Sequence, residues 1–239
     1  MDKDAPDLST KDVNRSHSYW WTGAKSALPI VFGYIPIGFA FGVLAVKAGI
    51  GFLPALLMSV FVYAGSAQLI AVGLIGAGAD LVSITLTTFV VNLRHLLMSA
   101  ALAPYLRHLS RGEAAWFGFE LTDESFAVHS SELAKEESSR SHLFALNGTA
   151  QLAWVVGTML GALLGVSMGD TGRWGLDFAL PAMFIALLIL QCKSRRHILV
   201  AVAAAVISVA LAAGFTARWN VIIATLIAGI LGVYLEKWS

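Results

Sequence analysis

Long apolar runs constrain this chain more than any other feature of its sequence. Seven of them can be placed, at 26–46, 53–76, 82–104, 142–166, 176–192, 197–214 and 219–236. A helix rises about 1.5 Å per residue, so a run of about twenty residues covers the hydrocarbon core of a bilayer. The runs are apolar on nearly every face rather than on alternate residues. They therefore predict membrane helices and not the strands of a membrane barrel.

Composition supports the same class of fold. Hydrophobic residues make up 57% of the 239 residues and charged residues 13%, which is too apolar for a soluble domain of this size. We expect an all-α, polytopic transmembrane bundle of about seven to eight membrane segments, forming a single domain over 23–239. Residues 1–22 are polar and lack the apolar core of a secretory signal, so we expect a cytoplasmic N-terminal tail.

The distribution of Lys and Arg sets the expected topology. These residues cluster in the N-terminal tail, in the long polar stretch 105–141, and at 193–196. If all three clusters are cytoplasmic, the chain crosses the membrane an even number of times before the polar stretch ends. Three apolar runs do not do that. Either one of them is re-entrant or broken, or Glu113–Leu133 forms an additional polar or amphipathic membrane helix. Both termini are expected in the cytoplasm.

The third run carries a cation at its centre. Arg94 is ten or more residues from either end of 82–104, too far for its side chain to reach water. Such a residue costs about 2.5–3.5 kcal/mol at the bilayer centre, so it should face a partner or a polar cavity. A polar stripe lies on the other side of the same helix: Thr85, Thr88, Asn92, His95 and Ser99. We expect this helix to be central in the bundle or interrupted near Asn92.

Other polar or helix-breaking residues fall at membrane depth in the first two runs. The first run has five prolines and glycines within a few turns, which predicts a discontinuous helix: Pro29, Gly33, Pro36, Gly38 and Gly42. In the second run, Gln68, Ser66 and Tyr63 contact either a substrate or neighbouring helices. The segment Gly65–Leu69 recurs as Gly148–Leu152, which leaves an internal repeat open.

The acids of the polar stretch and the glycines of the fourth run can each be explained by helix structure alone, without a role in substrate binding. Glu113, Glu120, Glu124 and Ser131 share one face if 113–133 is helical, although Thr122 followed by two acids is also a normal helix start. These acids are the only acidic cluster near enough in sequence to neutralise Arg94. Glycines at 157, 161 and 165 have the spacing of a helix-packing face.

Several function classes find no support. Gly76-Ala77-Gly78 has no preceding strand and no Walker lysine, so no ATP site is expected. No metal-binding motif and no nucleophile with an adjacent base occurs, and we expect neither cofactor nor enzyme activity. Cys192 is the only cysteine, which excludes an internal disulfide, and a net charge of +1 gives no basic surface for nucleic acid.

In combination and order, the motifs resemble those of the AzlC-type branched-chain amino acid exporters. The resemblance covers about 23–236 and is carried by Leu28-Pro29, Gly33-Tyr34-Ile35-Pro36, Phe39-Ala40-Phe41-Gly42, Tyr63-Ala64-Gly65-Ser66-Ala67-Gln68, Arg94-His95, Leu121-Thr122-Asp123-Glu124-Ser125-Phe126-Ala127 and Leu180-Pro181-Ala182-Met183-Phe184. It implies export of small apolar amino acids from the bacterial cytoplasm across the inner membrane, together with a small AzlD-like membrane subunit. Where family members often have an acid just before Arg-His, this chain has Asn92-Leu93.

The residues suggest how a zwitterion would be held in a secondary transporter. Arg94, or the amides of a broken first helix near Gly33 and Pro36, would meet the carboxylate. Asp123 or Glu124, with Gln68, would meet the ammonium group. The full set of candidate substrate contacts is Arg94, Asn92, His95, Gln68, Ser66, Asp123, Glu124, Gly33 and Pro36, and the candidates for a coupling proton are His95, Asp123 and Glu124. The alternative is a channel or membrane scaffold whose polar centre only joins helices.

Overall fold

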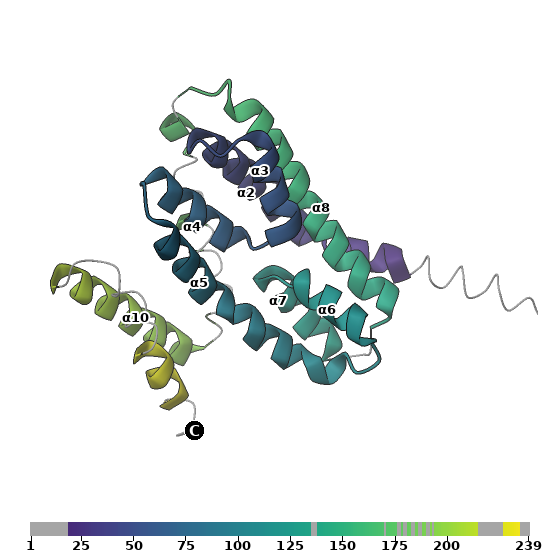
Figure 1. The fold of residues 1–239 in the computed structure, drawn as a ribbon. Helices are drawn as coiled ribbons and strands as arrows, with labels where there is room; N and C mark the ends of the chain where they lie inside the picture. Colours follow the sequence, from purple (N-terminus) through teal and green to yellow (C-terminus); the bar gives the residue numbers. More distant parts are fainter. Residues whose placement is uncertain are drawn as a thin grey trace, which may run out of the picture. The chain divides into compact units, whose positions relative to one another are not determined.

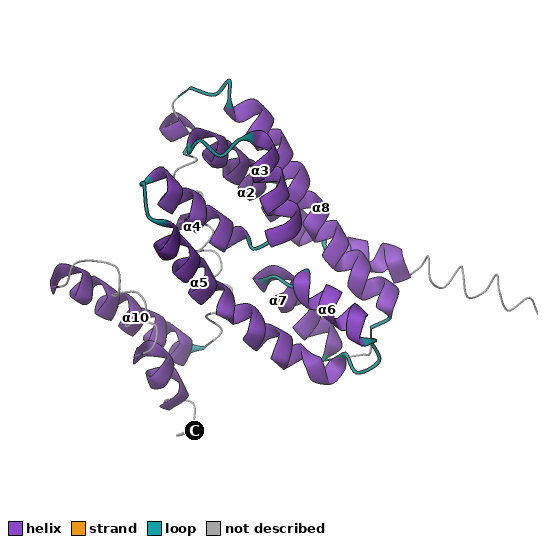
Figure 2. Ribbon diagram, in the orientation of Figure 1, coloured by secondary structure: helices purple, strands orange, loops and turns teal. Residues whose placement is uncertain are grey.

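The computed structural model describes residues 19–134, 138–169, 171–175, 178, 181–182, 185, 188–189, 192, 194–214 and 227–234. The chain divides into two compact units, Met1–Leu180 and Pro181–Ser239. Every regular element within the described residues is helical, which confirms the all-α prediction (Figure 2).

The first unit contains a helix at 19–26 followed by the elements labelled in Figure 1. These are α2 (Leu28–Lys47), α3 (Phe52–Leu57), the π-helix η1 (Met58–Val62), α4 (Gly65–Gly76), α5 (Leu81–Leu102), the 3₁₀-helix η2 (Ala103–Tyr105), α6 (Arg111–Phe119), α7 (Asp123–Leu133), α8 (Arg140–Gly165) and the 3₁₀-helix η3 (Thr171–Trp174). The second unit contains α10 (Arg195–Gly214) and a helix at 227–234. Most of the predicted run 176–192 lies outside the described residues.

Within the described residues, three of the predicted apolar runs form helices long and apolar enough to cross a membrane. They are α2, α5 with η2, and α8, of 20, 25 and 26 residues. Their bounds agree with the predicted runs to within about two residues, because each run ends where Gly, Pro or charged residues begin.

Helices α2 and α8 run parallel and touch along their length through glycines. A methyl group at Gly157 would lie 2.6 Å from the Ile35 carbonyl oxygen, and one at Gly161 would collide with the Phe39 carbonyl. On the other side, a methyl group at Gly38 would lie 2.8 Å from the Trp154 carbonyl oxygen. Only glycine allows two backbones this close, so the prediction that the α8 glycines serve helix packing is confirmed.

The second apolar run folds back on itself. After α3 and η1 the helix stops at Tyr63, which has a left-handed φ of 40°, and α4 begins at Gly65. The ring of Tyr63 lies 6.5 Å from that of Tyr34 in α2, whereas at the end of α4 a methyl group on Gly76 would be 3.7 Å from Cβ of Ala48. The segment α3–η1 therefore runs from the C-terminal end of α2 back to the level of Tyr34, and α4 returns to the C-terminal end of α2. We call α3, η1 and α4 the first hairpin.

The polar stretch forms a second hairpin, made of α6 and α7, which enters from the opposite end of α2 and α8. At its open end, Arg140 at the start of α8 donates to Glu113 Oε1 and to the His108 carbonyl, and His142 bonds Glu132. At its closed end, Asp123 pairs with Arg94 in the middle of α5. Figure 1 shows α6 and α7 between α5 and α8, and α7 packs on both.

Two expectations from the sequence are wrong. Helix α2 is continuous through Pro36, because its contacts with α8 hold it on both sides of that residue. Helix α5 is uninterrupted at Asn92, which leaves a central place in the bundle as the remaining alternative for it; Met98 and Leu102 are its buried residues in the described structure. Glu113–Leu133 is not a single helix, because Glu120–Thr122 break it, and its acids do not share one face.

Candidate functional site

An ion pair lies where the second hairpin meets α5. Arg94 Nη1 is 2.5 Å from Asp123 Oδ2, and Arg94 Nη2 donates to the Ser66 hydroxyl at the start of α4. The two charged side chains are 28% and 12% exposed. Both are therefore largely shielded from water, where the loss of either partner leaves a costly uncompensated charge. The predicted Arg94 partner is thus Asp123.

Tyr34 joins the two hairpin tips. Its hydroxyl donates to Glu124 Oε2 at 2.6 Å and lies 2.7 Å from Thr122 Oγ1, while its ring packs edge-on against Tyr63 at 6.5 Å and Trp154 at 5.4 Å. Tyr34 belongs to α2, and its side chain is buried. We call Tyr34, Ser66, Arg94, Thr122, Asp123 and Glu124 the central cluster. It draws on α2, α4, α5 and α7.

The start of α7 is built to hold two carboxylates. Thr122 is the N-cap: its Oγ1 accepts from the Ser125 amide, and the Ser125 hydroxyl accepts from the Thr122 amide. Asp123 and Glu124 occupy the first turn, where unpaired amides and the helix dipole favour negative charge. The predicted helix start at Thr122 is confirmed.

The tip of the first hairpin is held by two glutamines. Gln68 is 1% exposed, accepts from the Ala64 amide and Trp154 Nε1, and donates to Ser59. Gln151 in α8 donates to the Val60 carbonyl, which the end of η1 leaves available. The side chain of Gln68 thus joins α4 to η1 and α8.

The two copies of the short sequence repeat lie in different structural contexts. Gly65–Leu69, which contains Gln68, begins α4, whereas Gly148–Leu152, which contains Gln151, lies in the middle of α8.

Of the other predicted substrate contacts, Asn92 and His95 lie on the same helix as Arg94, whereas Gly33 and Pro36 lie on α2. Asn92 and His95 are half-buried on α5, and His95 lies within electrostatic range of Arg94. Asn92 Oδ1 is buried and makes no hydrogen bond within the described part of the chain. Gly33 and Pro36 lie within the continuous helix α2, and nothing is within 4 Å of a methyl group placed at Gly33. Because α2 is continuous, it offers no free amides there.

Sequence reasoning placed Glu120 among the acids near Arg94 and Thr122 at a helix start, but it included neither of them, nor Tyr34, among the candidate site residues. Tyr34 is a phenol within an otherwise apolar run, and Glu120 stands at the end of a short helix. A search for polar groups in every apolar run would have found Tyr34. No periodicity in the sequence indicates that the tips of two hairpins meet.

The acid at the other end of α6 has an ordinary surface environment. Glu113 is part of a capping box with Ser110, and hydrogen bonds from the Ser110 side chain and amide, helped by Arg140, lower the pKa of Glu113. It lies away from the central cluster.

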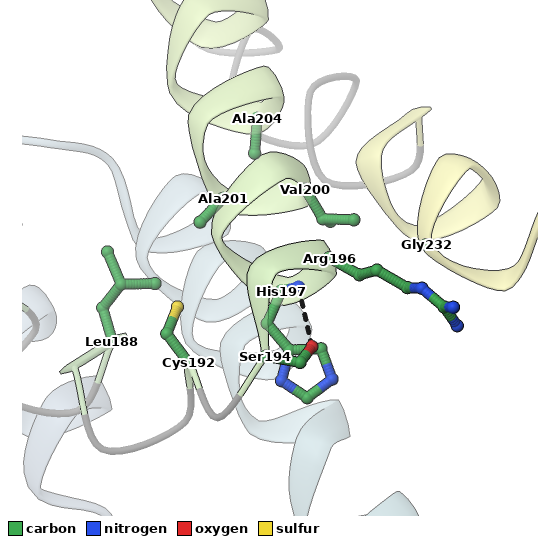
Figure 3. Close-up of a pocket in the computed structure, with 9 residues that line it drawn as sticks. All are labelled: Leu188, Cys192, Ser194, Arg196, His197, Val200, Ala201, Ala204 and Gly232. Carbon is green, nitrogen blue, oxygen red and sulfur yellow. Dashed lines mark hydrogen bonds between the residues drawn. The ribbon is translucent and has the colours of Figure 1, made fainter. Parts of the chain in front are cut away.

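One cleft of about 470 Å³ lies in the first unit and another of about 470 Å³ lies in the second. The first is mainly apolar, lies beside both hairpin tips, and is lined by Val60, Phe61, Trp116, Phe119, Gly148, Gln151, Leu152 and Val155. The second unit's cleft, shown in Figure 3, contains none of the predicted site residues. There the Ser194 hydroxyl accepts from the His197 amide at 3.3 Å, which caps the start of α10.

Comparison with known proteins identifies the relatives of this chain. Residues 29–168 match the family model described as AzlC protein, and this range includes the whole central cluster. The chain belongs to the AzlC family. It is a membrane protein, as the apolar helices and the relatives agree. The resemblance stated from its motifs is thereby confirmed.

Curated AzlC-family relatives cover most of the chain. The inner membrane protein YgaZ of Escherichia coli is 30% identical over 187 residues, which are 76% of each chain. An uncharacterized membrane protein of Archaeoglobus fulgidus is 32% identical over 223 residues, 91% of this chain and 94% of that one. The branched-chain amino acid transport protein AzlC of Bacillus subtilis is 26% identical over 204 residues, 82% and 80% of the two chains. No solved structure matches.

Proposed function

We propose that this AzlC-family protein exports branched-chain amino acids across the bacterial cytoplasmic membrane as a secondary transporter coupled to an ion or proton. Valine, leucine and isoleucine are the proposed substrates, with methionine as a further candidate. The observation that carries the proposal is the Arg94–Asp123 ion pair, shielded from water at the level where two helical hairpins meet. The name of the Bacillus subtilis relative supports the substrate class.

The chemistry of the pair suits a zwitterion. An amino acid brings one carboxylate and one ammonium group, so it can enter between a guanidinium and a carboxylate and replace each lost contact with an equivalent one. Arg94 would take the substrate carboxylate and Asp123, with Glu124 nearby, would take the ammonium group. This exchange avoids leaving either protein charge unpaired at membrane depth.

The apolar cleft beside the tips offers room for the aliphatic side chain. Gly148 lines it, and nothing lies within 4 Å of a methyl group placed there. Gly148→Leu should therefore fill the cleft without disturbing α8 and slow transport of leucine more than that of alanine. Selectivity among valine, leucine and isoleucine should be loose, because one methylene in an apolar pocket is worth only about 1–3 kcal/mol.

The two hairpins suggest how the topology meets the positive-inside rule. With α2, α5 and α8 as full crossings and both hairpins re-entrant from opposite sides, the N-terminal tail and the polar stretch share the cytoplasmic side. With the three apolar runs of the sequence after residue 175 as further crossings, this proposal gives eight membrane segments, a cytoplasmic C-terminus and one transporter domain over 23–239. A small AzlD-like subunit is the proposed partner, and lipid covers the remaining apolar surface.

Valine efflux tests the proposal directly. Cells lacking their own exporters are loaded with labelled valine, and efflux is compared for the normal chain, Arg94→Ala and Asp123→Asn, each checked for membrane insertion. We expect both variants to lose efflux, and Arg111→Ala, an exposed arginine, to keep it. Normal efflux by inserted Arg94→Ala would contradict the assignment.

The alternative is a channel or a scaffold. Counterflow in liposomes separates a carrier from a channel, because only a carrier exchanges labelled valine against a reverse gradient of unlabelled valine. A scaffold gives no flux, and its loss would not make cells sensitive to branched-chain dipeptides.

A further inference from the structure

Glu120 is a buried acid that the central cluster does not use. It follows the last residue of α6, at the tip of the second hairpin, and is 4% exposed. Its Oε2 is buried and has no hydrogen-bond partner within the described residues, and no cation there forms an ion pair with it. The Trp116 side chain hydrogen-bonds the carboxylate, but nothing in the described residues replaces the water that Oε2 has lost, which makes the ionised form costly.

The ends of the two helices give neighbouring acids different surroundings. Asp123 and Glu124 lie in the first turn of α7, at the positive end of the helix dipole, and Asp123 also pairs with Arg94. Glu120 is the C-cap of α6, at the negative end, where the dipole disfavours a negative charge. In the described structure Glu120 therefore lacks both the cation and the favourable helix end that Asp123 has.

The groups around Glu120 supply no compensating charge. From the first hairpin it faces Tyr63, which lies within electrostatic range of Glu120 and Glu124 and whose hydroxyl is also buried and without a hydrogen bond in the described chain. From α7, His129 packs against Phe117 of α6 with ring centroids 4.9 Å apart, and its Nε2 is bonded to Asn147. Arg94 is already committed to Asp123 and Ser66.

We propose that Glu120 binds the proton that is exchanged for the substrate. This inference rests on the proposed function and names its coupling ion. A proton from the outer aqueous phase binds the Glu120 carboxylate, giving the neutral acid, and is released to the cytoplasm as the carboxylate re-forms. One zwitterion leaves for each proton that enters, so each cycle moves one positive charge inward.

The three coupling residues expected from the sequence are less suited to this role. Asp123 is paired with a permanent cation, and Glu124 accepts a hydrogen bond from Tyr34 at 2.6 Å. His95 follows Arg94 directly in α5, so a protonated ring would place two positive charges side by side. Protonation of Asp123 or Glu124 would weaken an existing interaction of the carboxylate, whereas Glu120 Oε2 makes no hydrogen bond within the described residues.

Two transport modes separate proton coupling from substrate binding. The full chain, produced with an AzlD-like subunit, is placed in liposomes, and labelled valine is followed in two ways. The first is uptake or efflux driven by an imposed pH gradient. The second is exchange of valine for valine with no gradient. The variants are Glu120→Gln, Glu120→Asp and the control Glu113→Gln, which changes a half-buried acid at the other end of the same helix.

We expect Glu120→Gln to lower gradient-driven flux at least about tenfold while exchange changes less than about threefold, since only the first needs a proton to bind. Glu120→Asp should recover part of the gradient-driven flux, and Glu113→Gln should match the normal chain in both modes. Equal loss of both modes in Glu120→Gln would overturn the proposal, because a structural or ammonium-binding residue acts on both. Exchange without any response to pH in the normal chain would overturn proton coupling but not transport. Absence of both in the normal chain would instead refute the proposed function.

Discussion

Arg94 in α5 and Asp123 in α7 form an ion pair of 2.5 Å that ties the second hairpin to a membrane-spanning helix. Removing one member leaves the other charge uncompensated, and we expect Arg94→Ala to destabilise the protein by about 3–5 kcal/mol. The double variant Arg94→Ala/Asp123→Ala should recover most of that loss, yet not transport valine. Thermal unfolding in detergent measures the first effect and efflux the second. A double variant no more stable than the single one would contradict a direct pairing.

Tyr34→Phe removes the hydroxyl that reaches both Thr122 and Glu124. A hydrogen bond to a charged group is worth about 1.5–3 kcal/mol, so we expect a stability loss of that order and slower transport. Tyr105→Phe, in which an exposed phenol loses its hydroxyl, should have no effect on either. If the two variants behave alike, Tyr34 does not join the hairpin tips.

Tyr63→Phe should behave differently, because the buried Tyr63 hydroxyl has no hydrogen-bond partner in the described chain. Removing an unsatisfied polar atom leaves stability unchanged or raises it by about 1 kcal/mol. Transport driven by a pH gradient should nevertheless fall if this hydroxyl faces the bound proton. Unfolding and flux measured on the same preparation test the two halves. A marked loss of stability would mean that the hydroxyl has a partner after all.

Gly161→Leu should prevent α2 and α8 from packing, because even a methyl group there would collide with the Phe39 carbonyl. We expect little properly folded protein, measured as a sharp peak in gel filtration. Gly73→Ala is the matched control: nothing lies within 4 Å of its added methyl group, and the helix should gain about 0.5–1 kcal/mol. Normal yield of Gly161→Leu would refute the close packing.

Single cysteines can test the re-entrant hairpins, because Cys192 is the only cysteine and can be replaced by serine. Cysteines at Gly51 and Ala77, which are exposed on either side of the first hairpin, should both react with an impermeant reagent from outside the cell. Cysteines at Arg107 and Ser139, on either side of the second, should react only after the membrane is opened. Labelling of Gly51 and Ala77 from opposite sides would show a crossing in place of a hairpin.

Apolar run length by itself determined the positions of α2, α5 and α8, because a stretch of about twenty apolar residues has few stable alternatives to a membrane helix. Local chemistry also determined the N-cap at Thr122, and the cost of a buried cation determined that Arg94 needs a partner. Only the tertiary structure decided which acid that partner is. It also decided that α2 passes through Pro36 while the second run breaks at Tyr63, since backbone packing against α8 and side chains such as Gln151 outweigh local propensity. Because the meeting of Tyr34, Tyr63 and Glu124 depends on contacts between residues far apart in the chain, no local pattern in the sequence encodes it.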